Sequence, residues 1–83
     1  MTEADQVLVL HRWLVDECGF VLVEARVRYE HPALEVSVCR ALLADTVAKG
    51  AQRDFFRAVM EAVQRARRRT GDAFGQAEFV ALQ

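Results

Sequence analysis

The histidines and neighbouring carboxylates are the first side chains of this chain to consider for acid–base chemistry. His11 and His31 are its two histidines, and neither has a cysteine, serine or carboxylate at the helix or hairpin spacing that would make it a base or a ligand. Asp16 and Glu17 are adjacent, so on a helix they point about 100° apart and do not converge as an acid–base pair. The sequence therefore predicts no catalytic residue, and we do not expect an enzyme.

Cysteine usage and phosphate-binding motifs lead to the same expectation. Cys18 and Cys39 lie far apart, without a CxxC motif or a histidine pair, so we expect reduced thiols and no metal site. Lys49 and Gly50 precede a helix, but the Walker pattern GxxxxGK[ST] and the dinucleotide pattern GxGxxG are missing. We therefore expect no cofactor and no small-molecule ligand.

Basic side chains are concentrated in the C-terminal part of the chain. Residues 1–50 carry eight acids against five bases, whereas residues 51–83 carry six arginines against four acids. Arg53, Arg57, Arg67 and Arg68 fall on one side of a helix expected at 51–70. Such a row could contact successive phosphates of RNA or DNA, although Glu61 lies in the same arc and no aromatic residues interleave for base stacking.

Composition indicates one folded domain that spans residues 1–83. Hydrophobic residues make up 53% of the chain and charged residues 28%, which is the balance of a globular protein with one core. No apolar run approaches the roughly 20 residues that a membrane-spanning helix needs, and the first residues are acidic where a signal peptide would be basic. We therefore expect a cytoplasmic protein that does not enter a membrane.

The first expected element is a helix at about 3–18. Thr2 is a candidate N-cap with Asp5 as its capping-box partner, and Gly19 stands where a helix-ending glycine belongs. Its apolar positions fall on one broad arc, but Val9 and Trp13 lie on the otherwise polar side. This pair is expected to be exposed, so Trp13 is a candidate anchor for a partner.

Period-two alternation then predicts two strands, at 20–29 and 34–43, joined by a turn at Pro32. Pairing Tyr29 with Leu34 gives an antiparallel register in which paired residue numbers sum to 63. The core face of this register contains Val21, Val23, Ala25, Val27 and Tyr29, paired with Leu42, Arg40, Val38, Val36 and Leu34. Arg40 is therefore expected on the core face opposite Val23, where it must either extend to the edge of the sheet or pair with a carboxylate, Glu17 or Asp45.

The reverse face of the same hairpin is predicted to be apolar at one end. It would expose Phe20, Leu22, Ala41 and Leu43. An apolar patch of this size is unusual on a small domain and indicates an interaction surface. Together with Val9 and Trp13, these residues form the predicted partner interface.

A second amphipathic helix is expected from about 51 to 70, ended by Gly71, and a third strand from 77 to 82. The predicted fold is thus α+β, a two-layer α-β-β-α-β arrangement with two helices on one face of a three-stranded sheet. A right-handed crossover would place the third strand parallel to the second.

Residues Leu14 to Cys39 contain a helix, a glycine, an aromatic residue and a Leu-Val pair that lead into a hairpin. This pattern resembles the N-terminal domain of the ribosome maturation factor RimP family. The element order also resembles type II KH and ribosome-binding-factor arrangements. The resemblance implies RNA binding, but the chain has no GxxG loop of the KH type, and residues 44–83 depart from the RimP pattern.

Two function classes follow from these patterns. The first is a non-catalytic protein-interaction module, either a homodimer or a small subunit that docks on a larger partner. The alternative is a small RNA- or DNA-binding accessory factor that uses the arginine row of the second helix. Affinity that falls steeply with salt would favour the alternative.

Overall fold

The computed structural model describes residues 1–69 and 78–82. It is a mixed α+β fold with three α-helices and a four-stranded sheet, where the sequence predicted two helices and three strands. The elements in chain order are α1 (Glu3–Arg12), a π-helical turn (Trp13–Glu17), β1 (Val21–Val23), a 3-10 turn (Glu24–Arg26), β2 (Arg28–Glu30), β3 (Val36–Cys39), α2 (Ala41–Ala48), α3 (Gln52–Arg69) and β4 (Glu78–Val80).

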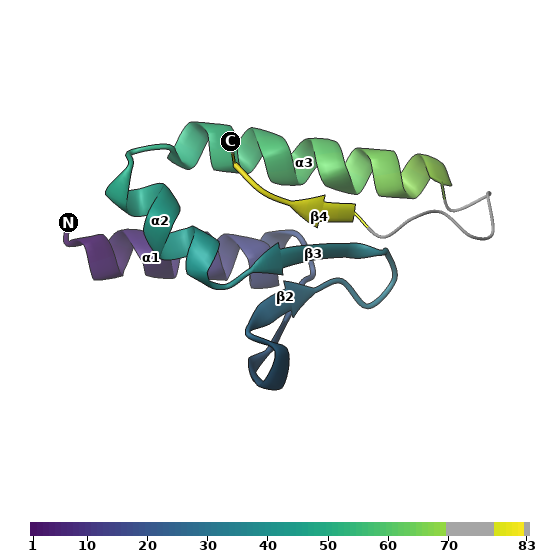
Figure 1. Ribbon diagram of the computed structural model, residues 1–83, viewed down its shortest axis with the longest axis horizontal. Coiled ribbons are helices and arrows are strands. Elements are labelled where there is room, and N and C mark those ends of the chain that lie inside the picture. The colour runs from purple at the N-terminus through teal and green to yellow at the C-terminus, as the bar shows by residue number, and fades with distance from the viewer. Residues whose placement is uncertain (70–77, 83) are drawn as a thin grey trace.

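The strands lie side by side in the order in which they occur in the chain (Figure 1). The β1–β2 and β2–β3 pairs are antiparallel, and β4 runs parallel to β3. The parallel return after α3 agrees with the expected crossover connection. The predicted glycine stop at position 71 lies outside the described residues.

Local signals set both ends of the first helical segment. The Thr2 hydroxyl accepts a hydrogen bond from the Asp5 amide at 3.1 Å, and the Asp5 carboxylate accepts one from the Thr2 amide, so the predicted capping box is present. After Arg12 the helix continues as a π-helical turn. Gly19 has a φ of +79°, a left-handed conformation that glycine adopts at little cost.

The prediction of one long strand at 20–29 is wrong, because the chain reverses direction at residues 24–27 and forms two short strands. These strands pair with each other, Leu22 with Tyr29, and the second also pairs with β3, Tyr29 with Val38. Paired numbers therefore sum to 51 and 67, not to 63. In one continuous strand Tyr29 would share a face with Val21 and Val23, whereas after the reversal it shares a face with Leu22.

The predicted end of the second strand is wrong as well. Residues from Ala41 onward form α2, and Arg40 is exposed in a helical conformation at its N-terminus. The Arg40 amide donates to the Val27 carbonyl at 3.1 Å, which ties the start of α2 to the hairpin reversal. Arg40 therefore does not lie on a core face.

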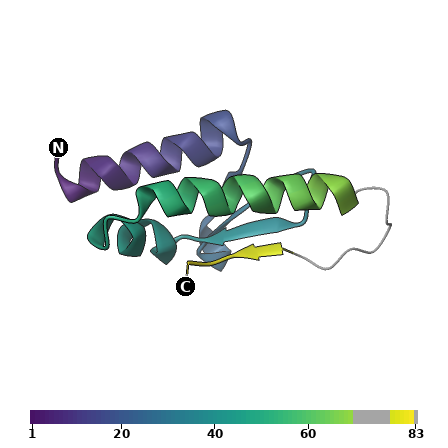
Figure 2. The ribbon, with the colours of Figure 1, turned by 90° about the horizontal axis from the view of Figure 1, so that it is seen from above.

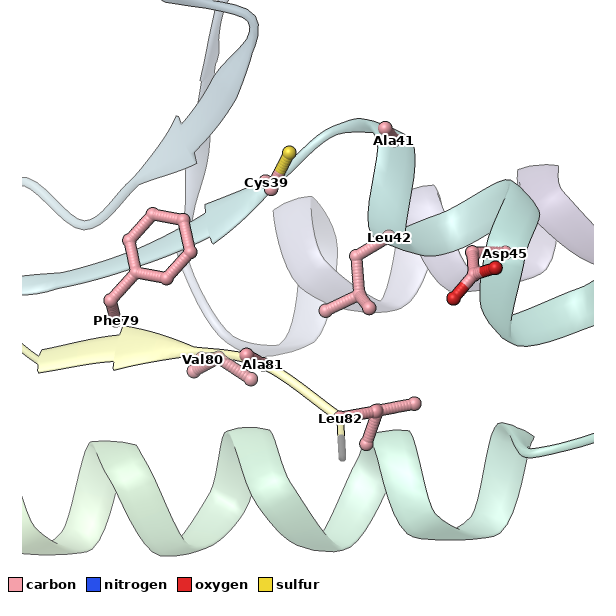
Figure 3. A pocket seen from close by; sticks show the side chains of 8 residues that line it. All are labelled: Cys39, Ala41, Leu42, Asp45, Phe79, Val80, Ala81 and Leu82. Carbon is pink, nitrogen blue, oxygen red and sulfur yellow. The ribbon is translucent and has the colours of Figure 1, made fainter.

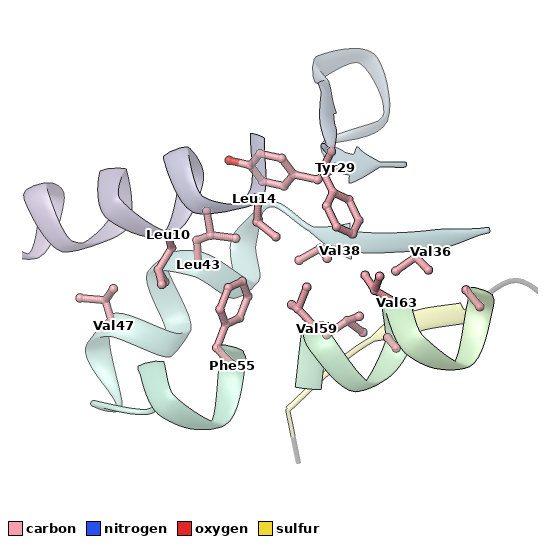
Figure 4. Packing of buried hydrophobic residues seen from close by; sticks show 14 residues of the cluster. Leu10, Leu14, Tyr29, Val36, Val38, Leu43, Val47, Phe55, Val59 and Val63 are labelled. Carbon is pink, nitrogen blue, oxygen red and sulfur yellow. The ribbon is translucent and has the colours of Figure 1, made fainter. Parts of the chain in front are cut away.

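The core lies between the sheet and the helices (Figure 4). Leu10 and Leu14 contribute to it from the first helical segment, Tyr29 and Val38 from the sheet, and Phe55 from α3. The 18-residue α3 confirms the helix predicted at 51–70, and its buried positions lie within the predicted apolar arc. Burial of this face supplies the main driving force for folding.

Val27 is a strained position in the hairpin reversal. Its φ is +53°, and it is the one non-glycine residue with positive φ among those described. A β-branched side chain is poorly suited to this left-handed conformation, and Val27 is exposed, so its side chain gains little from packing.

We predict that Val27→Asn raises the free energy of unfolding by about 0.5–1 kcal/mol, because asparagine tolerates the left-handed region. Urea denaturation followed by circular dichroism measures the change. Val21→Asn, which alters an exposed valine of ordinary conformation in β1, is the control and should not stabilise the fold. A Val27→Asn variant that is less stable than the parent would contradict the backbone strain inferred at Val27.

Candidate interaction surface

One face of the sheet is covered by helices and the other is open. Tyr29 and Val80 belong to the covered face, where Tyr29 lies 2.7 Å from Nδ1 of His11 on α1 and Val80 belongs to the core. Glu78, which shares the side of Val80 on β4, bonds with arginines of α3. Helices α1 and α3 therefore lie on the same side of the sheet (Figure 2).

Seven side chains point away from the helices and form what we call the open sheet face. The register arranges them in two rows across the strands. The first row is Val21, Glu30, Ser37 and Phe79, and the second row is Val23, Arg28 and Cys39. Phe79 is 59% exposed and Val21 is 53% exposed, so two large apolar side chains lie in water at opposite edges of this face.

An ion pair occupies the middle of the open sheet face. Arg28 Nε donates to Glu30 Oε2 at 2.6 Å, and Arg26 Nη1 reaches the same oxygen at 3.2 Å. Partial burial alone would raise the pKa of Glu30, but the hydrogen bonds from Arg28 and Arg26 lower it overall. The centre of the face is therefore charged with both signs, while its flanks are apolar.

An open pocket of about 380 Å³ lies at the β4 end of the open sheet face (Figure 3). It is mostly apolar and is lined by Cys39, Ala41, Leu42, Asp45, Phe79, Val80, Ala81 and Leu82. A shallow apolar hollow beside an exposed aromatic ring is a shape that an apolar side chain of a partner could fill.

The residues of the predicted interface lie partly in the core and partly on the surface. Phe20 and Leu43 are each 1% exposed and belong to the core, so their predicted exposure is wrong. Leu22 is partly buried against the core, on the helix side of the sheet. Ala41 is exposed and lines the pocket beside the open sheet face.

The structure places Val9 and Trp13, predicted together in the interface, in different environments. Val9 is 46% exposed, as predicted. Trp13 instead packs edge-on against Phe56 and Phe55, with ring centroids 4.7 and 6.1 Å away. The apolar arc of the first helix is thus wider than predicted, because α3 lies alongside it.

The exposed aromatic that the sequence analysis missed is Phe79. Alternation in 77–82 assigns Phe79 and Val80 to opposite faces, and Val80 is the buried one. The missed valines, Val21 and Val23, were assigned to the core because the hairpin reversal was not recognised. No Asn-Gly or Asp-Gly pair marks the reversal at 24–27.

The arginines of α3 differ in their contacts. Arg65 and Arg69 bond with Glu78 of β4, at 2.6 and 2.7 Å. Arg53, Arg57 and Arg68 are exposed and form no ion pair within residues 1–69 and 78–82. Arg67 is also exposed but takes part in an interaction within the chain.

Glu78 joins β4 to the last turns of α3. Hydrogen bonds from Arg69 and Arg65 lower the pKa of this carboxyl group below its ordinary value. A carboxylate with a lowered pKa in the folded state stabilises the fold above the pKa of the unfolded chain. That contribution is lost as the pH falls through the folded pKa.

We therefore predict that the parent chain loses more stability than Glu78→Gln between about pH 6 and pH 3, the range in which carboxyl groups titrate. Chemical denaturation at a series of pH values measures the difference. Glu61→Gln, which changes an exposed carboxylate on α3, is the matched control and should follow the parent. Parallel pH profiles for the parent and Glu78→Gln would show that the link contributes nothing.

The two histidines have hydrogen-bond partners within the fold. Nδ1 of His31 accepts hydrogen bonds from the amides of Ala33 and Leu34, at 3.0 and 3.1 Å. Burial raises the pKa of the Tyr29 hydroxyl beside His11, and burial also raises the pKa of the Cys18 thiol. A thiol with a raised pKa is a weaker nucleophile at neutral pH.

The described part of the chain contains neither a cluster of metal-ligating side chains nor a helix that could cross a membrane. Residues 1–69 and 78–82 contain no group of three or more metal-ligating side chains. Within the same residues, no helix has both the length and the apolar character needed to cross a bilayer.

Comparison of the chain with protein-family models, with curated proteins and with solved structures finds no match. The resemblance to ribosome maturation factors is thus not supported by a family match.

Proposed function

We propose that this chain is a non-catalytic protein-interaction module and that it binds its partner through the open sheet face. The observation that carries the proposal is the exposure of Phe79 and Val21 on a sheet face that no described element covers. Burial of exposed aromatic and aliphatic side chains gives affinity at recognition surfaces, and complementary charges fix the orientation of the partner.

The proposal is tested by site-specific photo-crosslinking. Phe79→p-benzoylphenylalanine places the reactive group on the open sheet face, and the matched control, Met60→p-benzoylphenylalanine, places it on α3, where Met60 is 44% exposed. Irradiation of cells that express each variant should give a protein adduct from position 79 and none from position 60. No adduct at position 79, or an equal yield at both positions, would overturn the proposal.

A second candidate function is the binding of RNA or DNA by α3. It is favoured by the exposed guanidinium groups of Arg53, Arg57 and Arg68, which leave α3 with a basic side away from the core. Electrostatic binding of this kind weakens as salt displaces phosphate contacts.

Fluorescence polarisation with a labelled RNA duplex and with a labelled single strand, at low and at moderate salt, tests this candidate. The double variant Arg53→Glu/Arg57→Glu should abolish binding, whereas Arg12→Glu, which changes an exposed arginine of α1, should not. Absence of binding by the parent chain at low salt would exclude the candidate.

A further inference from the structure

The open sheet face has an internal complementarity that points to one occupant. Its two rows run side by side across the sheet, one containing Glu30 and the other containing Arg28. Arg28 and Glu30 stand on either side of Tyr29 in β2. The two rows therefore carry opposite charges at equivalent places.

The other positions of the two rows are also matched. Val21 and Val23 occupy equivalent places on β1, and Ser37 and Cys39, both small, occupy equivalent places on β3. On the β4 side, Phe79 ends the first row. Continuing the parallel register past Val38 and Val80 puts Ala81 beside Cys39, and both residues line the pocket.

We propose that the open sheet face binds a second copy of this chain, face to face and with antiparallel strands. A two-fold axis between the rows, parallel to the sheet and running across its strands, places each row over the other row of the second copy. Glu30 then faces Arg28 of the second copy, valines face valines, and Phe79 lies over Ala81 and the adjoining pocket. This inference names the partner of the surface given under "Proposed function" and rests on that function.

The packing that results is that of an aligned β-sandwich with helices on its two outer sides. Such an interface is isologous, so each contact occurs twice. The face is small, since its strands contain three or four residues each, and stable interfaces usually bury about 800 Å² per partner. We therefore expect a reversible dimer whose population rises with protein concentration.

Charge exchange tests the arrangement sharply. Arg28→Glu leaves carboxylates at both position 28 and position 30, and Glu30→Arg leaves guanidinium groups at both. Each variant should repel its own copies and dimerise about 10-fold or more weakly than the parent. An equimolar mixture should form a heterodimer, because in that pair each carboxylate again faces a guanidinium group.

Sedimentation equilibrium of the parent, of each variant and of the mixture gives the association constants, and circular dichroism verifies that every variant is folded. Phe79→Ser should also weaken the dimer, whereas Arg12→Glu on α1 should leave it unchanged. Two results would overturn the proposal: a parent chain that remains monomeric at every concentration, or a mixture that associates no better than its components.

The photo-crosslinking experiment separates this inference from the function on which it rests. An adduct at position 79 with twice the 9.4 kDa mass of the chain supports the second copy. An adduct of another mass supports the interaction module but overturns the second copy as its partner. Absence of an adduct overturns both.

Discussion

Replacing Phe55 by alanine should lower the free energy of unfolding by about 3–5 kcal/mol, the range seen when a buried aromatic ring is truncated. Phe55 is completely buried and makes edge-on contacts with Trp13 and Phe56, so it joins α3 to the first helix. The variant would leave a cavity between α3 and the first helix. Urea denaturation measures the loss, and the m value of the variant is compared with that of the parent chain.

A graded series keeps this prediction testable if Phe55→Ala does not fold. Phe55→Leu preserves most of the volume and should cost about 1–1.5 kcal/mol, while Phe56→Ala, at a partly buried position, should cost less than Phe55→Ala. A loss below about 1 kcal/mol in Phe55→Ala would mean that α3 does not pack on the core as described.

Replacing Trp13 by alanine should lower the free energy of unfolding by about 2–3 kcal/mol, somewhat less than truncation of a fully buried aromatic residue, because Trp13 is partly buried. The sequence analysis expected an exposed anchor at this position, and truncation of such an anchor would weaken association without unfolding the chain. Denaturation of Trp13→Ala, together with sedimentation of the folded variant, distinguishes the two roles.

Fluorescence gives an independent measurement, since Trp13 is the one tryptophan of the chain. Trp13 lies on the helix side of the sheet, so its emission should not change with protein concentration even if the open sheet face dimerises. Val9→Ala, at an exposed position of α1, should change stability by less than about 0.5 kcal/mol. A blue shift of the parent's emission on concentration would place Trp13 in an interface.

The elements that were predicted correctly are those with strong local signals. The helix at 51–70 has an apolar arc of period 3.6 that extends over five turns, and the structure buries Phe55, Val59 and Val63 within it. The first helix has a capping box at Thr2 and a glycine at position 19. Caps and long periodic arcs depend on neighbouring residues, so they can be read without knowledge of the fold.

The hairpin could not be read in this way. Residues 20–29 alternate as well in one strand as in two, and the reversal depends on Val27 in a left-handed conformation that its residue type does not favour. The contact that fixes the reversal, from the Arg40 amide to the Val27 carbonyl, joins residues far apart in the sequence. Tertiary pairing therefore overrides a local preference at this point.

The sequence by itself determined the first helix, α3 and most of the apolar face of each, whereas α2 was not predicted and replaces the end of an expected strand. The tertiary structure alone decided which face of the sheet is open. The reversal pairs Leu22 with Tyr29, so even-numbered positions before the turn share the side of odd-numbered positions of β2; Phe20 therefore lies in the core and Val21 on the open sheet face. The parallel pairing of β4 with β3 brings Phe79 to the same pocket as Cys39 and Ala41, because side chains distant in sequence share a surface only once strands have paired.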